Sequence, residues 1–202
     1  MNKHFTTVAA AAFIAGSASA DLMYASGVAN FSQGLTKGGA AVDADRTITS
    51  KALGAPQIND TMNFVSLGFG GSIILTFDST FGGSLTVWET TYGSRSSYRE
   101  AAEVFVGFGA DWSSATYYSV GQITNATAGV TMSLSQVEED SGRQAFNFLK
   151  IVDATNSALH NNSGDGFDVD GVGAELRTVP APGGVALAAF LGLGAMRRRR
   201  TN

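Results

Sequence analysis

Three aspartates near the carboxyl end of the chain are the residues best placed to do chemistry together. In an extended segment Asp168 and Asp170 point to the same face, and Gly164 and Gly166 let the backbone turn so that Asp165 can join them. Carboxylate oxygens are the ligands that Ca²⁺ prefers, and without a cation the three groups would repel one another. The stretch therefore predicts a calcium site. The alternative is a solvated acidic edge strand that discourages aggregation.

The spacing does not fit an EF-hand loop. Counting from Asp165, Leu176 falls at the twelfth position and Glu175 comes one residue early. Further ligands must come from elsewhere in the chain, and we expect such an ion to hold the fold together rather than to catalyse a reaction.

The sequence offers little for enzymatic catalysis. It has no cysteine, and His160 is the only histidine outside the first residues of the chain, which argues against thiol, zinc and Ser-His-Asp chemistry. We expect His160 to be an exposed loop residue. A glycoside hydrolase needs only two carboxylates, and Glu89, Glu100 and Glu103 keep that alternative open.

Aromatic residues form the second candidate site. Trp88, Trp112 and Tyr92 could together present flat faces on which sugar rings stack, and exopolysaccharide is the partner that this predicts. Alternation along the chain also places Trp88 on the same face as Thr86 and Thr90. Packing of Trp88 beneath a loop is therefore the alternative.

The elements that must position these residues are strands. Runs of alternating or β-branched residues are separated by glycine and small polar residues about every ten positions, as expected of an all-β sandwich. The expected strands cover residues 28–31, 46–50, 64–69, 72–78, 84–91, 103–108, 117–123, 130–134, 145–152 and 166–176. A single helical turn is expected at 98–102, and one domain accounts for the whole of residues 21–178.

The amino-terminal residues 1–20 predict a secretory signal peptide. Lys3 supplies the positive start, residues 5–16 are apolar, and Ala18, Ser19 and Ala20 form a small-residue cleavage site. A buried first helix is the alternative. We expect signal peptidase to cut after Ala20 and the protein to be exported.

The carboxyl-terminal residues 179–202 predict a membrane tail. An apolar run follows a Pro-Gly hinge and ends in four arginines, which the positive-inside rule leaves in the cytoplasm. At about 1.5 Å per residue the run is about 20 Å long as a helix, short of the roughly 30 Å of bilayer hydrocarbon. A plain tail anchor and a buried helix are the alternatives to a processed tail.

The charge of residues 21–178 excludes one class of partner. The whole chain has 13 basic and 17 acidic residues, and without Lys3 and the four terminal arginines 8 basic residues remain against the same 17 acidic ones, a net charge of −9. Such a surface argues against nucleic acid, whose phosphates need a basic face.

The tail resembles the PEP-CTERM sorting signal of bacteria that use exosortases. The resemblance rests on Val179, Pro180, Ala181, Pro182 and Gly183 as the short motif. It also rests on the terminal cluster, which is Arg197, Arg198, Arg199 and Arg200. It implies a transient inner-membrane intermediate, cut by an exosortase-like protease and released to the cell surface or extracellular matrix.

The body resembles bacterial cell-surface proteins with a jelly-roll, discoidin-like or carbohydrate-binding-module-like sandwich. The segments that carry the resemblance are 52–56, 64–72, 85–90, 103–106 and 165–170, in that order. Glu89 and Glu103 stand at strand positions in these motifs, which makes them the candidates for the further calcium ligands. The sequence thus predicts an exported, non-catalytic protein with a structural or adhesive role, and a carbohydrate-binding module is the alternative.

Overall fold

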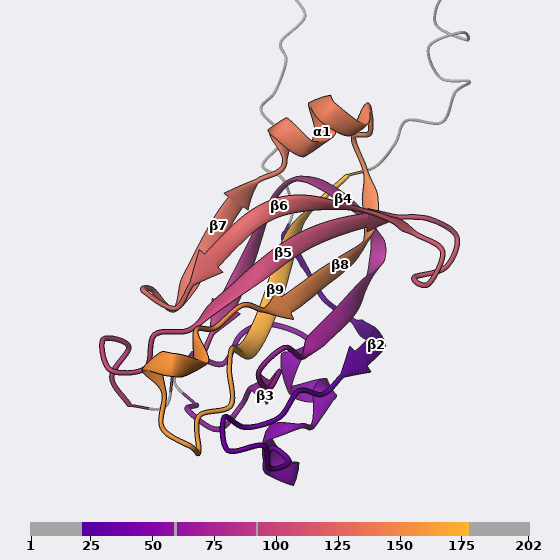
Figure 1. Cartoon of the computed structure of the whole chain (residues 1–202). Helices are drawn as coiled ribbons and strands as arrows, with labels where there is room; N and C mark the ends of the chain where they lie inside the picture. Colours follow the sequence, from indigo (N-terminus) through magenta and orange to yellow (C-terminus); the bar gives the residue numbers. More distant parts are fainter. Residues whose placement is uncertain (1–21, 59, 92, 178–202) are drawn as a thin grey trace, which may run out of the picture.

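The computed structural model describes residues 22–58, 60–91 and 93–177 (Figure 1). The predicted signal peptide, the predicted sorting signal and Tyr92 lie outside these residues. Within the described ranges no helix is both long enough and apolar enough to cross a membrane.

The described chain is mostly antiparallel β-sheet, as the sequence predicts. The strands are β1 (Leu22–Tyr24), β2 (Gly27–Ser32), β3 (Val65–Ser66), β4 (Ser72–Glu89), β5 (Ala101–Phe108), β6 (Thr116–Thr124), β7 (Gly129–Ser133), β8 (Phe146–Asp153) and β9 (Asp168–Leu176). One α-helix, α1 (Ser135–Ser141), and three short 3₁₀ turns, η1 (Ala44–Arg46), η2 (Thr49–Ala52) and η3 (Ser157–Leu159), complete the elements.

Strand β4 belongs to both layers of the fold. Its first part, residues 72–76, pairs with β2 and β8, whereas its last part, residues 84–89, pairs with β7 and β9. The register shifts between the two parts, where Gly83 adopts a φ of 73° that favours glycine. One continuous sheet therefore folds over on itself as a sandwich.

The core fills the space between the two layers. Aliphatic side chains from both parts of β4 meet those of the partner strands, because alternate residues of each strand point inward. The fully buried members include Ile73, Leu75, Leu85, Val104, Val106, Leu149, Ile151 and Val172. Burying their apolar surface stabilises the packed layers by roughly 25 cal/mol of free energy per Å² removed from water.

The two ends of the sandwich carry different structures (Figure 1). Helix α1, between β7 and β8, lies at the end of the sandwich where β9 finishes. At that end Leu176 of β9 pairs with Phe81 of β4. The η3 turn follows β8 and lies at the other end, where β9 begins. Strand β1 pairs antiparallel with β9, with Leu22 opposite Glu175. We call the end that carries η3 the loop end.

Several elements differ from the sequence prediction. The strands expected at 72–78 and 84–91 are one strand, β4. Residues 46–50 do not form a strand but fall in η1 and η2, where Ile48 is exposed and has no sheet face to join. The helical turn expected at 98–102 lies earlier, since the amides of Ser97 and Tyr98 both donate to the carbonyl of Ser94. Helix α1 escaped prediction because Val137 is its single buried residue.

Candidate functional site

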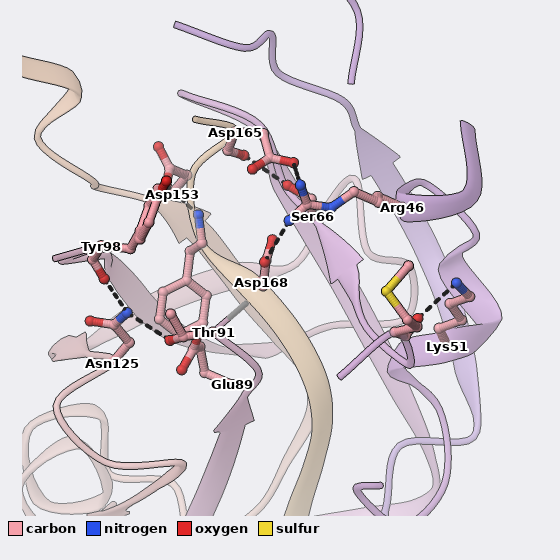
Figure 2. A network of polar contacts seen from close by, with 12 residues as sticks. Arg46, Lys51, Ser66, Glu89, Thr91, Tyr98, Asn125, Asp153, Asp165 and Asp168 are labelled. Carbon is pink, nitrogen blue, oxygen red and sulfur yellow. Dashed lines mark hydrogen bonds and ion pairs between the residues drawn. The ribbon is translucent and has the colours of Figure 1, made fainter. Parts of the chain in front are cut away.

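The centre of the candidate site is an arginine that bridges two buried aspartates (Figure 2). One terminal nitrogen of Arg46 lies 2.7 Å from Asp165 Oδ2, and the other donates to Asp168 Oδ2 at 2.9 Å. Arg46 ends η1, whereas Asp168 opens β9 and Asp165 lies in the loop before it. The guanidinium group thus stands between two of the carboxylates for which the sequence predicts calcium.

Asp153, the last residue of β8, forms hydrogen bonds that hold the loop that carries Asp165 in place. The Asp153 carboxylate accepts hydrogen bonds from the amides of Gly70, at 3.0 Å, and Phe167, at 2.9 Å. Gly166, which directly precedes Phe167, has a φ of 78°. It lies so close to Asp153 that any side chain at this position would clash with the carboxylate. Sequence reasoning missed Asp153, although its position at the end of an apolar strand resembles that of Asp168 at the start of one.

Asp170 has partners of its own. Its Oδ1 accepts a hydrogen bond from the amide of Gln57 at 3.0 Å and another from the side-chain amide of Asn63. Asp168 and Asp170 are at most 1% exposed, but Val169 between them is equally buried, so burial does not test the expectation that the two aspartates share one face. Their different partners separate them, so the three aspartates do not surround one point.

Glu89 and Glu100 form a buried pair beside the arginine-bridged aspartates. Thr91 donates to Glu89 Oε1 at 2.6 Å, and Arg95 Nε lies 3.6 Å from Glu89 Oε2. Burial raises the pKa of the Glu100 carboxyl group to about 10, and the charge of Glu89 lies close enough to contribute to the rise. Near neutral pH Glu100 therefore carries a proton, which relieves the repulsion between the two acids.

Asn125 holds this arrangement in place. Its side-chain carbonyl accepts from the amide of Glu100, and its NH₂ group donates to Thr91 Oγ1 and to the carbonyl of Tyr98 (Figure 2). Asn125 follows β6 directly and is 2% exposed. A single amide therefore ties together the segment after β4, the segment before β5 and the end of β6.

Glu103, the other predicted calcium ligand, faces away from this region. It is exposed on β5 between the buried residues Ala102 and Val104, so its side chain lies on the opposite face of the strand. Glu100, which the sequence suggested only as a catalytic carboxylate and which directly precedes β5, is instead the acid that lies near Glu89.

Burial raises the pKa of five acids in this region, which are Glu89, Glu100, Asp165, Asp168 and Asp170. The pKa of Glu100 rises to about 10, chiefly from burial and further from the negative charges of Asp168 and Glu89. Burial also raises the pKa of Asp168 well above its usual range, although the guanidinium of Arg46 opposes the shift. Near neutral pH the region therefore carries fewer negative charges than its number of acids suggests.

Glu100 borders two of the cavities at the loop end. The larger, of about 930 Å³, is called the loop-end pocket here; its polar lining consists of Ser94, Arg95, Ser96, Arg99, Glu100, Gln122, Thr124, Asn125 and Asn156. The smaller, of about 240 Å³, is lined by residues that include Arg46, Glu100, Asp165 and Asp168. Glu100 therefore lies in the wall between them.

The predicted aromatic platform is dispersed over the molecule. Trp88 lies on the second part of β4 and packs against Tyr24 with 6.1 Å between ring centroids. Trp112 lies in the β5–β6 connection, at the end of β5 away from the loop-end pocket, where its carbonyl accepts a hydrogen bond from Tyr117. The two tryptophans do not share a surface with the pocket.

His160 corrects another expectation. It is 5% exposed rather than a solvated loop residue, and its Nε2 lies 2.9 Å from the carbonyl oxygen of Arg99. Its ring packs near Phe69 and Tyr98. The residue supports the floor of the loop end, since a buried imidazole must satisfy its polar atoms in this way.

Within the described ranges, no three acidic or histidine side chains come close enough together to hold a metal ion. One carboxylate oxygen each of Glu89, Glu100 and Asp168 is nevertheless buried and accepts no hydrogen bond from the described residues. Calcium binding therefore stays a prediction.

No family model and no curated protein matches this chain. Among solved structures, one neighbour is a chain from the crystal structure of reduced XRCC1 bound to the DNA polymerase β catalytic domain, with a TM-score of 0.51 and 13% identity over 78% of this chain and 100% of that one. This likeness shows a shared fold.

Several weaker neighbours are carbohydrate-binding domains. Truncated AlyQ with CBM32 and alginate lyase domains has a TM-score of 0.45 and 12% identity, covering 80% of this chain and 36% of that one. The lectin domain of lectinolysin complexed with Lewis B antigen has a TM-score of 0.44 and 9% identity, covering 68% and 89%.

The raised pKa of Glu100 makes stability depend on pH. The folded protein holds this proton up to pH of about 10, whereas the unfolded chain releases it near the ordinary value of 4.5. Folding therefore binds a proton between these limits, and the free energy of unfolding falls as pH rises, by up to about 1.4 kcal/mol per pH unit for each proton.

We expect Glu100→Gln to flatten this slope, as measured by urea unfolding at pH 5, 7 and 9. Glu103→Gln, which changes an exposed carboxylate three residues further along the chain, is the matched control and should keep the original slope. An unchanged slope in Glu100→Gln would show that the acid pair does not hold the proton.

Proposed function

We propose that this chain is a non-catalytic saccharide-binding module and that the loop-end pocket is its binding site. The observation that carries the proposal is the pocket itself, whose volume of about 930 Å³ lies within the range of small-molecule sites. It is bordered by hydroxyl, amide and guanidinium groups from three separate segments. Such a surface suits a ligand that presents many hydroxyl groups, because each can both donate and accept a hydrogen bond.

Strand β6 supplies free polar groups to the pocket. Gln122 and Thr124 are exposed on either side of the buried Ile123, so their side chains share one face of the strand. Neither side chain forms a hydrogen bond with the described residues. Leu159 of η3 borders the same pocket and is 56% exposed, which provides an apolar surface for the carbon-bound face of a sugar ring.

The acid pair argues for binding rather than hydrolysis. A glycosidase holds its two carboxyl groups roughly 5 to 10 Å apart on opposite sides of the scissile bond. Glu89 is 3% exposed and does not border the loop-end pocket, so the two carboxyl groups do not flank a sugar bound there. Adhesion or matrix association, the role expected from the sequence, would then be the consequence of holding exopolysaccharide.

Saccharide binding is tested by native affinity electrophoresis of the protein in gels that contain dextran, galactan or polygalacturonate. We expect retardation in at least one gel, and we expect Gln122→Ala combined with Thr124→Ala to weaken the retention about tenfold through the loss of two hydrogen bonds. Trp112→Ala, at the far end of β5, should bind normally. Loss of binding in Trp88→Ala alone would move the site to the sheet face, and no retardation in any gel would remove the proposal.

Export is the second part of the proposal. It is supported by the predicted signal peptide at residues 1–20 and by the resemblance of residues 179–202 to an exosortase-processed tail, which connects the body to the membrane until it is cut. We expect the native protein at the cell surface to lack both segments. Mass spectrometry of surface extracts checks this, and a cytosolic chain that retains both ends would contradict it.

Calcium is proposed as a stabiliser of the loop end. The proposal is supported by the buried oxygens of Glu89, Glu100 and Asp168 that have no donor among the described residues. The carboxylates would have to draw together around the ion. We expect the melting temperature to fall after treatment with EDTA and to recover with added calcium but not with added sodium. Equal melting temperatures in all three conditions would remove calcium from the proposal.

A further inference from the structure

Two arginines set the charge of the loop-end pocket. Arg95 and Arg99 both border it, although the body of the protein has a large excess of acidic residues. Glu100 is the only acid among the residues that line the pocket. The pocket therefore concentrates positive charge on a molecule that is otherwise strongly negative.

Arg95 is held by an acid but not enclosed by it. Its Nε lies 3.6 Å from Glu89 Oε2, while 38% of its side chain is exposed. The Nε edge of the guanidinium thus faces the acid pair. Since the guanidinium carries five N–H donors, donors remain for a group that enters from the pocket.

Arg99 has a fixed backbone and a free side chain. Its carbonyl oxygen lies 2.9 Å from Nε2 of the buried His160, which anchors the residue at the rim of the pocket. The side chain is exposed, and its guanidinium forms no ion pair with any acid of the described ranges. An unpaired guanidinium at the mouth of a pocket is a ready receptor for an anion.

Glu100 does not cancel these charges. Its amide donates a hydrogen bond to Asn125, and among the described residues its carboxyl group forms no ion pair with either arginine. Glu100 is 6% exposed, so it contributes little surface to the pocket. The acid that borders the pocket is buried, whereas Arg95 is partly exposed and Arg99 is exposed.

We propose that the loop-end pocket selects acidic saccharides, with Arg99 and Arg95 receiving a carboxylate or sulfate group of the sugar. This inference rests on the proposed saccharide-binding function and names its ligand class. A guanidinium group can bind either anion through two parallel N–H···O bonds, which fixes orientation as well as charge. Gln122 and Thr124 then lie on β6 where they can meet the neighbouring hydroxyl groups.

The test compares polymers that differ only in charge. Affinity electrophoresis is run with polygalacturonate and with its fully methyl-esterified form, and separately with dextran sulfate and dextran. The first pair isolates the carboxylate and the second isolates the sulfate ester. We expect the charged member of at least one pair to bind about ten to one hundred times more tightly than its neutral partner.

Substitutions separate the pocket from overall charge. Arg99→Gln should abolish the preference for the charged polymer, and Arg99→Lys should keep part of it, because lysine retains the charge but not the fork. Arg143→Gln is the matched control: it removes one positive charge near Phe108, at the end of β5 away from the pocket. It should behave like the unsubstituted protein, and thermal melts confirm that each variant is folded.

The outcomes distinguish this inference from the proposed function. Equal binding of charged and neutral polymers would overturn the acidic preference and leave saccharide binding intact. An equal loss in Arg99→Gln and Arg143→Gln would assign the preference to overall charge and overturn the role of the pocket. Binding to none of the four polymers would overturn both proposals.

Discussion

The participation of β4 in both layers is the constraint on which the rest of the structure depends. Its first part aligns β8 and its last part aligns β9, so the ends of those two strands are brought to the same end of the sandwich. Asp153 at the end of β8 and Asp168 at the start of β9 meet there for that reason. The segment after Glu89 then leaves β4 beside them and forms the rim of the loop-end pocket.

Burying several acids at this end is unfavourable in free energy, and three features of the structure offset it. Arg46 pairs with Asp165 and Asp168, the raised pKa of Glu100 keeps that residue protonated beside Glu89, and backbone amides donate to Asp153 and Asp170. Each device neutralises or solvates a charge that would otherwise be buried without a partner. The pocket gains its positive character because these acids are occupied internally.

The sequence predicts the strands well and the partners poorly. Alternation locates most strands, and it also indicates that Asp168 and Asp170 are drawn to one face. The apolar residues Ala102 and Val104 carry the signal that turns Glu103 outward, but the choice of Glu103 followed the resemblance rather than that pattern. Arg46 could not have been found, because it precedes Asp165 by more than one hundred positions and only the folded sheet brings them together.

Strand β9, which pairs antiparallel with β1, runs from the loop end to the opposite end of the sandwich. Leu176, the last residue of β9, lies beside Phe81, whereas Val169 near its start lies beside Glu89 and the loop end. Leu176 lies seven residues after Val169 along the extended strand, which is about 23 Å at roughly 3.3 Å per residue. A body tethered through its carboxyl terminus would consequently hold its pocket outward, toward the surroundings and away from the layer to which it is fastened.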